Sequence, residues 1–209
     1  MTDFSKLTLS ELLEAIASEA PTPGGGTAAA VAAAMGAALA EMVAGVTLSK
    51  EKYAASHEAV RPIAGAARDA RREFLALARE DSAAFDLVVA ARRLPKNTEE
   101  EKAVRTKRIE EANRQATEVP MRTARAAARL LVSLPELVEK GNPNAASDAG
   151  SAALLLEAAA EAALLNVGIN LSGVSDDELV GSMQRETADL QEETRRLRDQ
   201  VLAEVRRRF

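Results

Sequence analysis

Residues that could do chemistry gather in three places, and the first is a proline–glycine turn. Pro21 to Thr27 reads PTPGGGT and opens an alanine-rich segment. Glycines let a ligand approach the backbone closely and reach positive φ angles without strain. A helix start also offers free N–H groups and a positive dipole end, which suit a carbonyl or an anion. The alternative is a plain connection between two helices. The turn residues that we expect to bind substrate are Pro23, Gly24, Gly25, Gly26 and Thr27.

The second candidate is Asp81, because it interrupts an apolar helical face. Phe74, Leu77, Ala84 and Val88 share its 3/4 spacing. An ionised carboxylate among such neighbours must be paired, bind a ligand or shift its pKa. The position favours a catalytic acid–base group. A structural carboxylate that a neighbouring helix satisfies fits the spacing nearly as well.

The third candidate is the turn from Gly141 to Asp148, which reads GNPNAASD and opens another apolar segment. Turn and cap formation explains one or two such residues but not the whole cluster. We expect Asn142, Asn144, Ser147 and Asp148 to contact substrate. In the helix that follows, Asn166 and Asn170 are spaced i,i+4 and share a face. Their amides either orient a heteroaromatic ligand or lock one helix to another, and locking is the favoured interpretation.

Composition removes several classes of site. The chain has 209 residues, no cysteine and a single histidine, His57. Disulfides, thiolate metal sites, a cysteine nucleophile and any site that needs two histidines are therefore excluded. The 27 basic and 32 acidic residues leave a formal charge of −5, which argues against nonspecific nucleic-acid binding.

The elements that must position these residues all have helical patterns. Capping boxes are predicted at Thr8 with Glu11, at Thr98 with Glu101 and at Ser175 with Glu178. We predict an all-α fold of about six helices, forming a single domain over residues 1–209. Two central alanine-rich helices are expected at 27–48 and 148–171, the first capped by Thr27.

Alanine buries little area, so we expect very close helix contacts and a homodimer that buries helix faces between subunits. The N-terminus lacks the pattern of a signal sequence. The run from residue 27 to 48 contains Glu41, which disfavours membrane insertion. We expect a cytoplasmic protein without membrane or nucleic-acid partners.

These segments together resemble the cyclodeaminase/cyclohydrolase family of folate enzymes, along nearly the whole chain. The two turns in combination are specific, whereas either alone would be weak. Thr27 stands where the family often has serine, which keeps the hydroxyl group. The segments that carry the resemblance are PTPGGGTAA from Pro21, MVA from Met42, LSKEKY from Leu48, DSAAF from Asp81, Val119-Pro120, GNPNAASD from Gly141 and NVGIN from Asn166.

The resemblance implies an all-α homodimer that binds a tetrahydrofolate derivative, with no metal or cofactor beyond that substrate. It implies formiminotetrahydrofolate cyclodeamination first, and methenyltetrahydrofolate hydrolysis as the alternative. On this basis Asp81 is the expected acid–base group, the glycine turn donates backbone N–H groups, and Asn142, Asn144 and Asp148 meet the pterin ring. Lys50 or Lys52 would meet the glutamate tail. A non-catalytic helical dimer, either folate-binding or a scaffold, is the remaining alternative.

Overall fold

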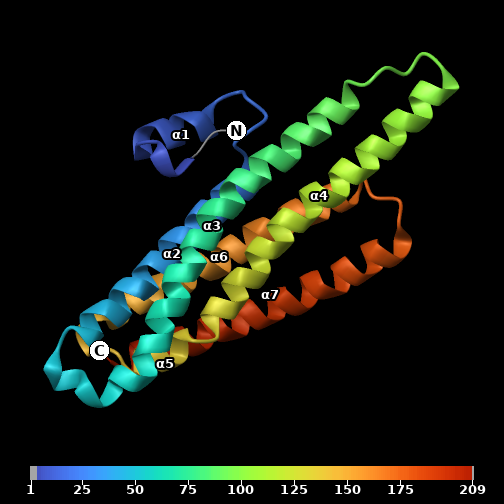
Figure 1. The fold of residues 1–209 in the computed structure, drawn as a ribbon. Coiled ribbons are helices and arrows are strands. Elements are labelled where there is room, and N and C mark those ends of the chain that lie inside the picture. The colour runs from blue at the N-terminus through green and yellow to red at the C-terminus, as the bar shows by residue number, and fades with distance from the viewer. Residues whose placement is uncertain (1–3, 209) are drawn as a thin grey trace.

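The structure is a computed structural model that describes residues 4–208, and every regular element in that range is helical (Figure 1). The expected all-α class is confirmed. The short helix α5 was not predicted separately from the sequence. In chain order the elements are η1 (Phe4–Lys6), α1 (Leu9–Ala17), α2 (Gly25–Leu48), η2 (Glu51–Ser56), α3 (His57–Arg92), α4 (Glu99–Leu131), α5 (Leu134–Lys140), η3 (Pro143–Ala145), α6 (Ala146–Leu171) and α7 (Asp177–Arg206).

The long helices α2, α3, α4, α6 and α7 lie along one axis and form an elongated bundle, with α1 beside it (Figure 1). Helices α2 and α6 are antiparallel neighbours. The start of α2, at Gly25, lies against Asn166 near the end of α6, whereas Gly36 lies against Leu156 further back along α6. The start of α2 therefore lies beside the end of α6, and the turn before α2 becomes a neighbour of the turn after α6.

The centre of the bundle is built from small side chains, as expected. Ala30, Ala33, Ala37 and Ala40 of α2 are completely buried. At Gly36 a Cβ atom would lie 2.9 Å from the Leu156 side chain, so even a methyl group would be too close. The two alanine-rich helices thus gain their contacts from close approach rather than from large side chains.

Of the four helix starts predicted from capping residues, two are confirmed and two are wrong. The capping boxes at Thr8 and Thr98 are both present. The prediction for Ser175 is wrong by one residue, because the Asp176 side chain accepts the cap hydrogen bond and α7 begins after it. The prediction that Thr27 caps the alanine-rich helix is also wrong. Gly24 is the N-cap of α2, and Thr27 lies inside the first turn.

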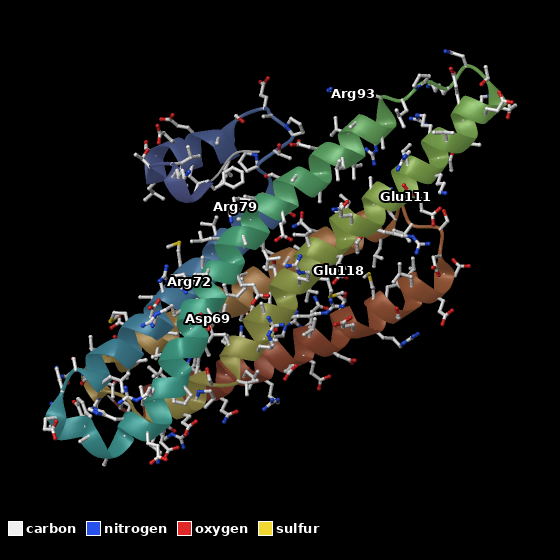
Figure 2. All side chains as sticks on the ribbon, in the orientation of Figure 1. Asp69, Arg72, Arg79, Arg93, Glu111 and Glu118 are labelled. Atoms are coloured by element: carbon white, nitrogen blue, oxygen red, sulfur yellow. The ribbon has the colours of Figure 1, made fainter. Side chains whose placement is uncertain are left out.

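Charged groups are distributed unevenly over the bundle. The outer faces of α3 and α4 carry many of them, including the labelled Arg72 and Glu118 (Figure 2).

By length and composition alone, α2 and the segment from Pro143 through α6 are apolar enough to cross a membrane. The glutamates of these segments nevertheless pair within the bundle: Glu41 of α2 contacts Arg71 at 2.9 Å, and Glu161 of α6 contacts an arginine of α7 at 2.6 Å. This arrangement fits the central helices of a bundle.

Candidate active site

A cavity of about 390 Å³ lies at the N-terminal end of α2, where α3, α4, α6 and the turn after α6 converge. This volume is in the range of small-molecule sites. Polar groups enter it from each of these elements. The lining residues that matter below are Gly24, Gly25, Gly26, Asp81, Arg92, Asn113, Asn166, Ile169, Asn170 and Gly173.

Asp81 of α3 supplies the carboxylate of this cavity. The predicted apolar surroundings are confirmed, because Phe74 and Leu77 are completely buried beside it on the same helix. The hydroxyl of Thr27 donates a hydrogen bond to Asp81 Oδ2 at 2.9 Å. The Ser82 and Thr27 hydroxyl oxygens are 3.0 Å apart. Because Thr27 has one hydroxyl proton, Ser82 is then the donor to Thr27, and the three side chains form a chain that ends on the carboxylate.

Burial raises the pKa of Asp81, and the hydrogen bonds from Thr27 offset only part of that rise. The carboxyl therefore holds a proton more readily than a solvated aspartate does. A carboxyl with a raised pKa is better suited to accept a proton and return it during a reaction than a solvated aspartate is.

The glycine turn is needed for space rather than for unusual backbone angles. No glycine among residues 4–208 has a positive φ, and Gly24 is extended at φ −123°. The turn therefore does not use the positive φ angles that its glycines permit. A Cβ atom at Gly26 would lie 2.7 Å from Asp81 Cγ and 2.8 Å from Oδ2. Gly26 thus allows the start of α2 to reach the carboxylate, and the N-cap residue Gly24 has no side chain with which to cap that first turn.

Three asparagines place amide groups around the cavity. Asn113 Nδ2 donates to the carbonyl of Gly173 at 2.9 Å, and Asn170 Nδ2 donates to the carbonyl of Ala116 at 2.7 Å. Asn166 Nδ2 donates to a carbonyl of its own helix at 2.8 Å. Asn170 therefore does link α6 to α4. With their N–H groups turned to carbonyls, the amides keep their Oδ1 atoms as acceptors for ligand N–H groups.

The asparagine-rich turn lies at the opposite end of α2. The backbone N–H of Asn142 donates to Thr47 Oγ1 at 2.8 Å, and the Tyr53 hydroxyl donates to Asn142 Oδ1 at 2.8 Å. Asn142 Oδ1 also accepts from the backbone of Asn144 at 3.1 Å. Buried Asn142 thus holds the turn against the end of α2, whereas the Asn144 and Ser147 side chains are exposed.

One chain therefore does not bring all the predicted site residues together. Helix α2 has 24 residues, which at 1.5 Å per residue separates its ends by about 36 Å. The cavity gathers Asp81 with the glycine turn. The predicted residues that lie at the far end are Lys50, Lys52, Asn142, Asn144, Ser147 and Asp148.

The lining residues that sequence reasoning missed include Arg92 and Asn113, which carry polar side chains. Arg92 lies at the C-terminal end of α3 and is exposed at the cavity. No local signal separates it from the other surface arginines. Asn113 lies in the polar half of α4, and an asparagine inside a helix was the weak signal that could have found it. Within the described residues no three His, Cys, Asp or Glu side chains are grouped so as to hold a metal ion.

Comparison with known proteins gives a consistent family. Residues 8–189 match the formiminotransferase-cyclodeaminase family. The chain is 40% identical over 200 residues to a methenyltetrahydrofolate cyclohydrolase of Methylorubrum extorquens, covering 95% of this chain and 96% of that protein. It is 35% identical to a rat formimidoyltransferase-cyclodeaminase over 81% of this chain, but spans only 31% of the rat protein. A crystal structure of formiminotetrahydrofolate cyclodeaminase from Thermotoga maritima superposes with a TM-score of 0.86 at 33% identity, covering 97% of both chains.

Proposed function

The chain belongs to the formiminotransferase-cyclodeaminase family, and we propose that it is a folate enzyme that hydrolyses 5,10-methenyltetrahydrofolate to 10-formyltetrahydrofolate. The cyclohydrolase relative supports this order of preference, because it matches at 40% identity along nearly all of both chains. Cyclodeamination, which the sequence analysis placed first, is the second candidate.

The observation that carries the proposal is the half-buried Asp81 carboxyl with its raised pKa. Water attacks the cationic carbon between N5 and N10, and Asp81 takes a proton from that water. The C–N5 bond then breaks as Asp81 returns the proton to N5, and release of the remaining hydroxyl proton to solvent leaves the formyl group on N10. General acid–base catalysis of this kind contributes about 10²- to 10⁴-fold. The ionised carboxyl also stabilises the cationic ring, since both are partly removed from water.

The remaining lining groups suit the other parts of a folate. The Oδ1 atoms of Asn113, Asn166 and Asn170 are acceptors for the N–H groups of the 2-amino-4-oxo pyrimidine ring. The backbone N–H groups of Gly25 and Gly26, at the start of α2, are donors for a carbonyl group. Arg92 is the cation for the carboxylates of the glutamate tail, in place of the Lys50 or Lys52 of the same chain. The reaction requires no metal or cofactor beyond the tetrahydrofolate substrate.

Cyclodeamination uses the same groups in another order. N10 attacks the formimino carbon on N5, the ring closes, and Asp81 donates a proton to the amino group that leaves as ammonia. The likeness to the Thermotoga maritima formiminotetrahydrofolate cyclodeaminase favours this candidate. The chain spans about a third of the length of the animal formimidoyltransferase-cyclodeaminases, so we do not propose the coupled transferase reaction.

Both substrates should be tested on the purified protein. Methenyltetrahydrofolate has a chromophore that hydrolysis destroys, whereas cyclodeamination of 5-formiminotetrahydrofolate creates the same chromophore. Hydrolase activity above the uncatalysed rate, lost in Asp81→Asn, is the expected result. Formation of the chromophore would establish the second candidate. No turnover of either substrate would refute both and favour a non-catalytic folate-binding or scaffold protein.

We further propose that the chain works in the cytoplasm as a homodimer of single-domain subunits spanning residues 1–209, without nucleic-acid or membrane partners. Five of the ten large apolar side chains exposed among the described residues lie on α2 and α6: Met35, Met42, Leu154, Leu165 and Ile169. Such a patch is larger than isolated surface residues explain, and it supports a protein interface. Sedimentation should give a dimer at micromolar concentration; a stable folded monomer would contradict this.

A further inference from the structure

We propose that the hydroxyl groups of Thr27 and Ser82 hold the Asp81 carboxylate by its Oδ2 atom, so that Oδ1 is presented to the substrate. Thr27 and Ser82 are then positioning residues, which act through Asp81 and do not touch the ligand. This inference rests on the proposed function and deepens it, because it states how the catalytic carboxyl is oriented. It also replaces the role that the sequence analysis gave to Thr27, which was a direct contact with substrate.

Thr27 is used differently from the other buried threonines among residues 4–208. It is completely buried in α2, yet its hydroxyl crosses to α3 and binds a side chain there. The carbonyl four residues before Thr27 belongs to Pro23, which lies outside the helix, so the usual acceptor within the helix is missing. The other buried threonines all donate to the carbonyl four residues earlier in their own helix: Thr47, Thr117, Thr123 and Thr194.

Ser82 determines the direction of the hydrogen bond from Thr27. Helix α3, which runs beside α2 (Figure 1), places Asp81 and Ser82 on successive residues, and both side chains reach Thr27. Thr27 gives its one hydroxyl proton to Asp81 Oδ2, so Ser82 donates to Thr27 Oγ1. In such a chain each donor polarises the next one and strengthens the last bond, here the bond to the carboxylate. Ser82 is only 8% exposed, so water has little access to its hydroxyl.

The two hydroxyls contact the carboxylate from behind the cavity wall. Asp81 and Gly26 line the cavity, whereas Thr27 and Ser82 are not among the described residues that line it. With Oδ2 engaged from behind, Oδ1 is the oxygen that a ligand meets. Catalytic groups have to be held within about 0.5 Å of the productive geometry by packing and by hydrogen bonds from neighbouring side chains. The two hydroxyls provide such a hold for Asp81.

Charged neighbours do not provide this hold. The cavity lining within the described residues has two charged groups, Asp81 and Arg92, and Arg92 lies eleven residues further along α3. That separation is about 16 Å at 1.5 Å per residue. Helices α2, α4 and α6 face the carboxyl with backbone groups, apolar side chains and the neutral amides of Asn113, Asn166 and Asn170. The pKa of Asp81 is accordingly raised by burial and lowered by hydrogen bonds from Thr27, so loss of the Thr27 hydroxyl raises it further.

Two substitutions at Thr27 separate its hydroxyl from its methyl group. Thr27→Val keeps the shape and loses the hydroxyl, whereas Thr27→Ser keeps the hydroxyl and loses the methyl group. Asp81 acts as a base when ionised, so kcat/KM for methenyltetrahydrofolate, corrected for uncatalysed hydrolysis, falls as the pH drops below its pKa. In Thr27→Val this fall should begin about 1–2 pH units higher, the shift expected when a charged group loses one hydrogen bond. Turnover above that pH should drop about 10- to 100-fold, because the carboxylate is no longer aligned. Thr27→Ser should keep the wild-type profile.

Ser82→Ala should have a smaller effect in the same direction. It removes the second hydroxyl but leaves the bond from Thr27 to Asp81, so only the cooperative part of that bond is lost. The expected shift is about 0.1–0.6 pH units. The matched control is Thr194→Val on α7, since Thr194 is also completely buried but donates to its own helix. It should leave the pH profile unchanged, whatever it does to stability.

The outcomes of these assays are decisive. A Thr27→Val enzyme with the pH profile and turnover of wild type overturns the inference and leaves the proposed function intact. A Thr27→Ser enzyme as impaired as Thr27→Val overturns it as well, because packing of the methyl group would then be the cause. Circular dichroism checks that Thr27→Val folds; if it does not, Thr27→Ala replaces it.

A second measurement needs no turnover. The isotope-labelled carboxyl carbon of Asp81, identified by its absence in Asp81→Asn, is followed by NMR in the free protein as the pH is raised. Its titration midpoint should lie about 1–2 pH units higher in Thr27→Val than in wild type and Thr27→Ser; equal midpoints would overturn the inference. If wild type turns over neither substrate, the proposed function is refuted, and the NMR midpoints still decide whether the hydroxyls act on the carboxylate.

Discussion

Adding one methyl group at Gly26 tests whether the position of the Asp81 carboxylate matters. In Gly26→Ala the new Cβ would stand 2.7 Å from Asp81 Cγ and 2.8 Å from Oδ2, whereas ordinary contact begins at 3.4 Å. The carboxylate must therefore move away by about 1 Å, and a misplacement of that size costs about 10²-fold in rate. The 2.9 Å hydrogen bond from Thr27 would be broken by the same movement.

The same change alters stability in a calculable direction. Loss of a hydrogen bond to a charged group costs about 1.5–3 kcal/mol, and replacing glycine by alanine inside a helix returns about 0.5–1 kcal/mol. Gly26→Ala should therefore unfold at modestly lower urea concentration and lose about 10²-fold in turnover with methenyltetrahydrofolate. The control is Gly65→Ala on α3, where an added Cβ meets nothing within 4 Å; it should keep its turnover.

A double variant separates this mechanism from general damage. If the methyl group acts by displacing the carboxylate, Gly26→Ala should add little to the loss already caused by Asp81→Asn. Fully multiplicative losses, or a Gly26→Ala enzyme with turnover within threefold of wild type (about 0.7 kcal/mol), would refute the reasoning.

Asp81→Asn should bind folate and lose about 10²- to 10⁴-fold in turnover, whereas Asp86→Asn, which changes an exposed carboxylate, should stay within a few-fold; near-normal turnover in folded Asp81→Asn would end the catalytic assignment. Because burial raises the pKa of Asp81 from 3.8, the folded state holds that proton more tightly than the unfolded chain. The stability it contributes at low pH is then lost as the pH rises through the raised pKa, so urea unfolding measured at increasing pH above 3.8 should show this loss in wild type but not in Asp81→Asn. Arg92→Ala should raise KM about fivefold at low salt with little change in kcat, and an effect that persists in high salt would argue against a role in charge pairing. Gly25→Val should weaken folate binding about tenfold or more with helix content unchanged, because its side chain enters the cavity beside Asn166; calorimetric titration showing equal affinity would contradict this.

Helix type and several helix ends followed from residues close together in the chain. Thr8 and Thr98 cap their helices through partners three residues away, so the pattern is complete within one turn. The surroundings of Asp81 were also predictable, because Phe74 and Leu77 belong to the same helix and helical spacing alone puts them beside it. The prediction that Ser175 caps α7 was wrong, because the neighbouring Asp176 is an equally good N-cap residue. Which of two adjacent residues becomes the cap depends on the conformation of the turn that precedes the helix.

The partners of Thr27 and Asn142 were decided only by tertiary structure. By local pattern Thr27 looked like a cap, but the approach of α3 gave its hydroxyl a carboxylate acceptor 54 positions along the chain. The sequence by itself determined which residues are chemically unusual: the glycine turn, Asp81 and the asparagine-rich turn. Their distribution over two ends of the bundle was decided by the antiparallel packing of α2 against α6, which depends on contacts between distant segments that no local spacing encodes. A helix of 24 residues then separates the two motifs by about 36 Å.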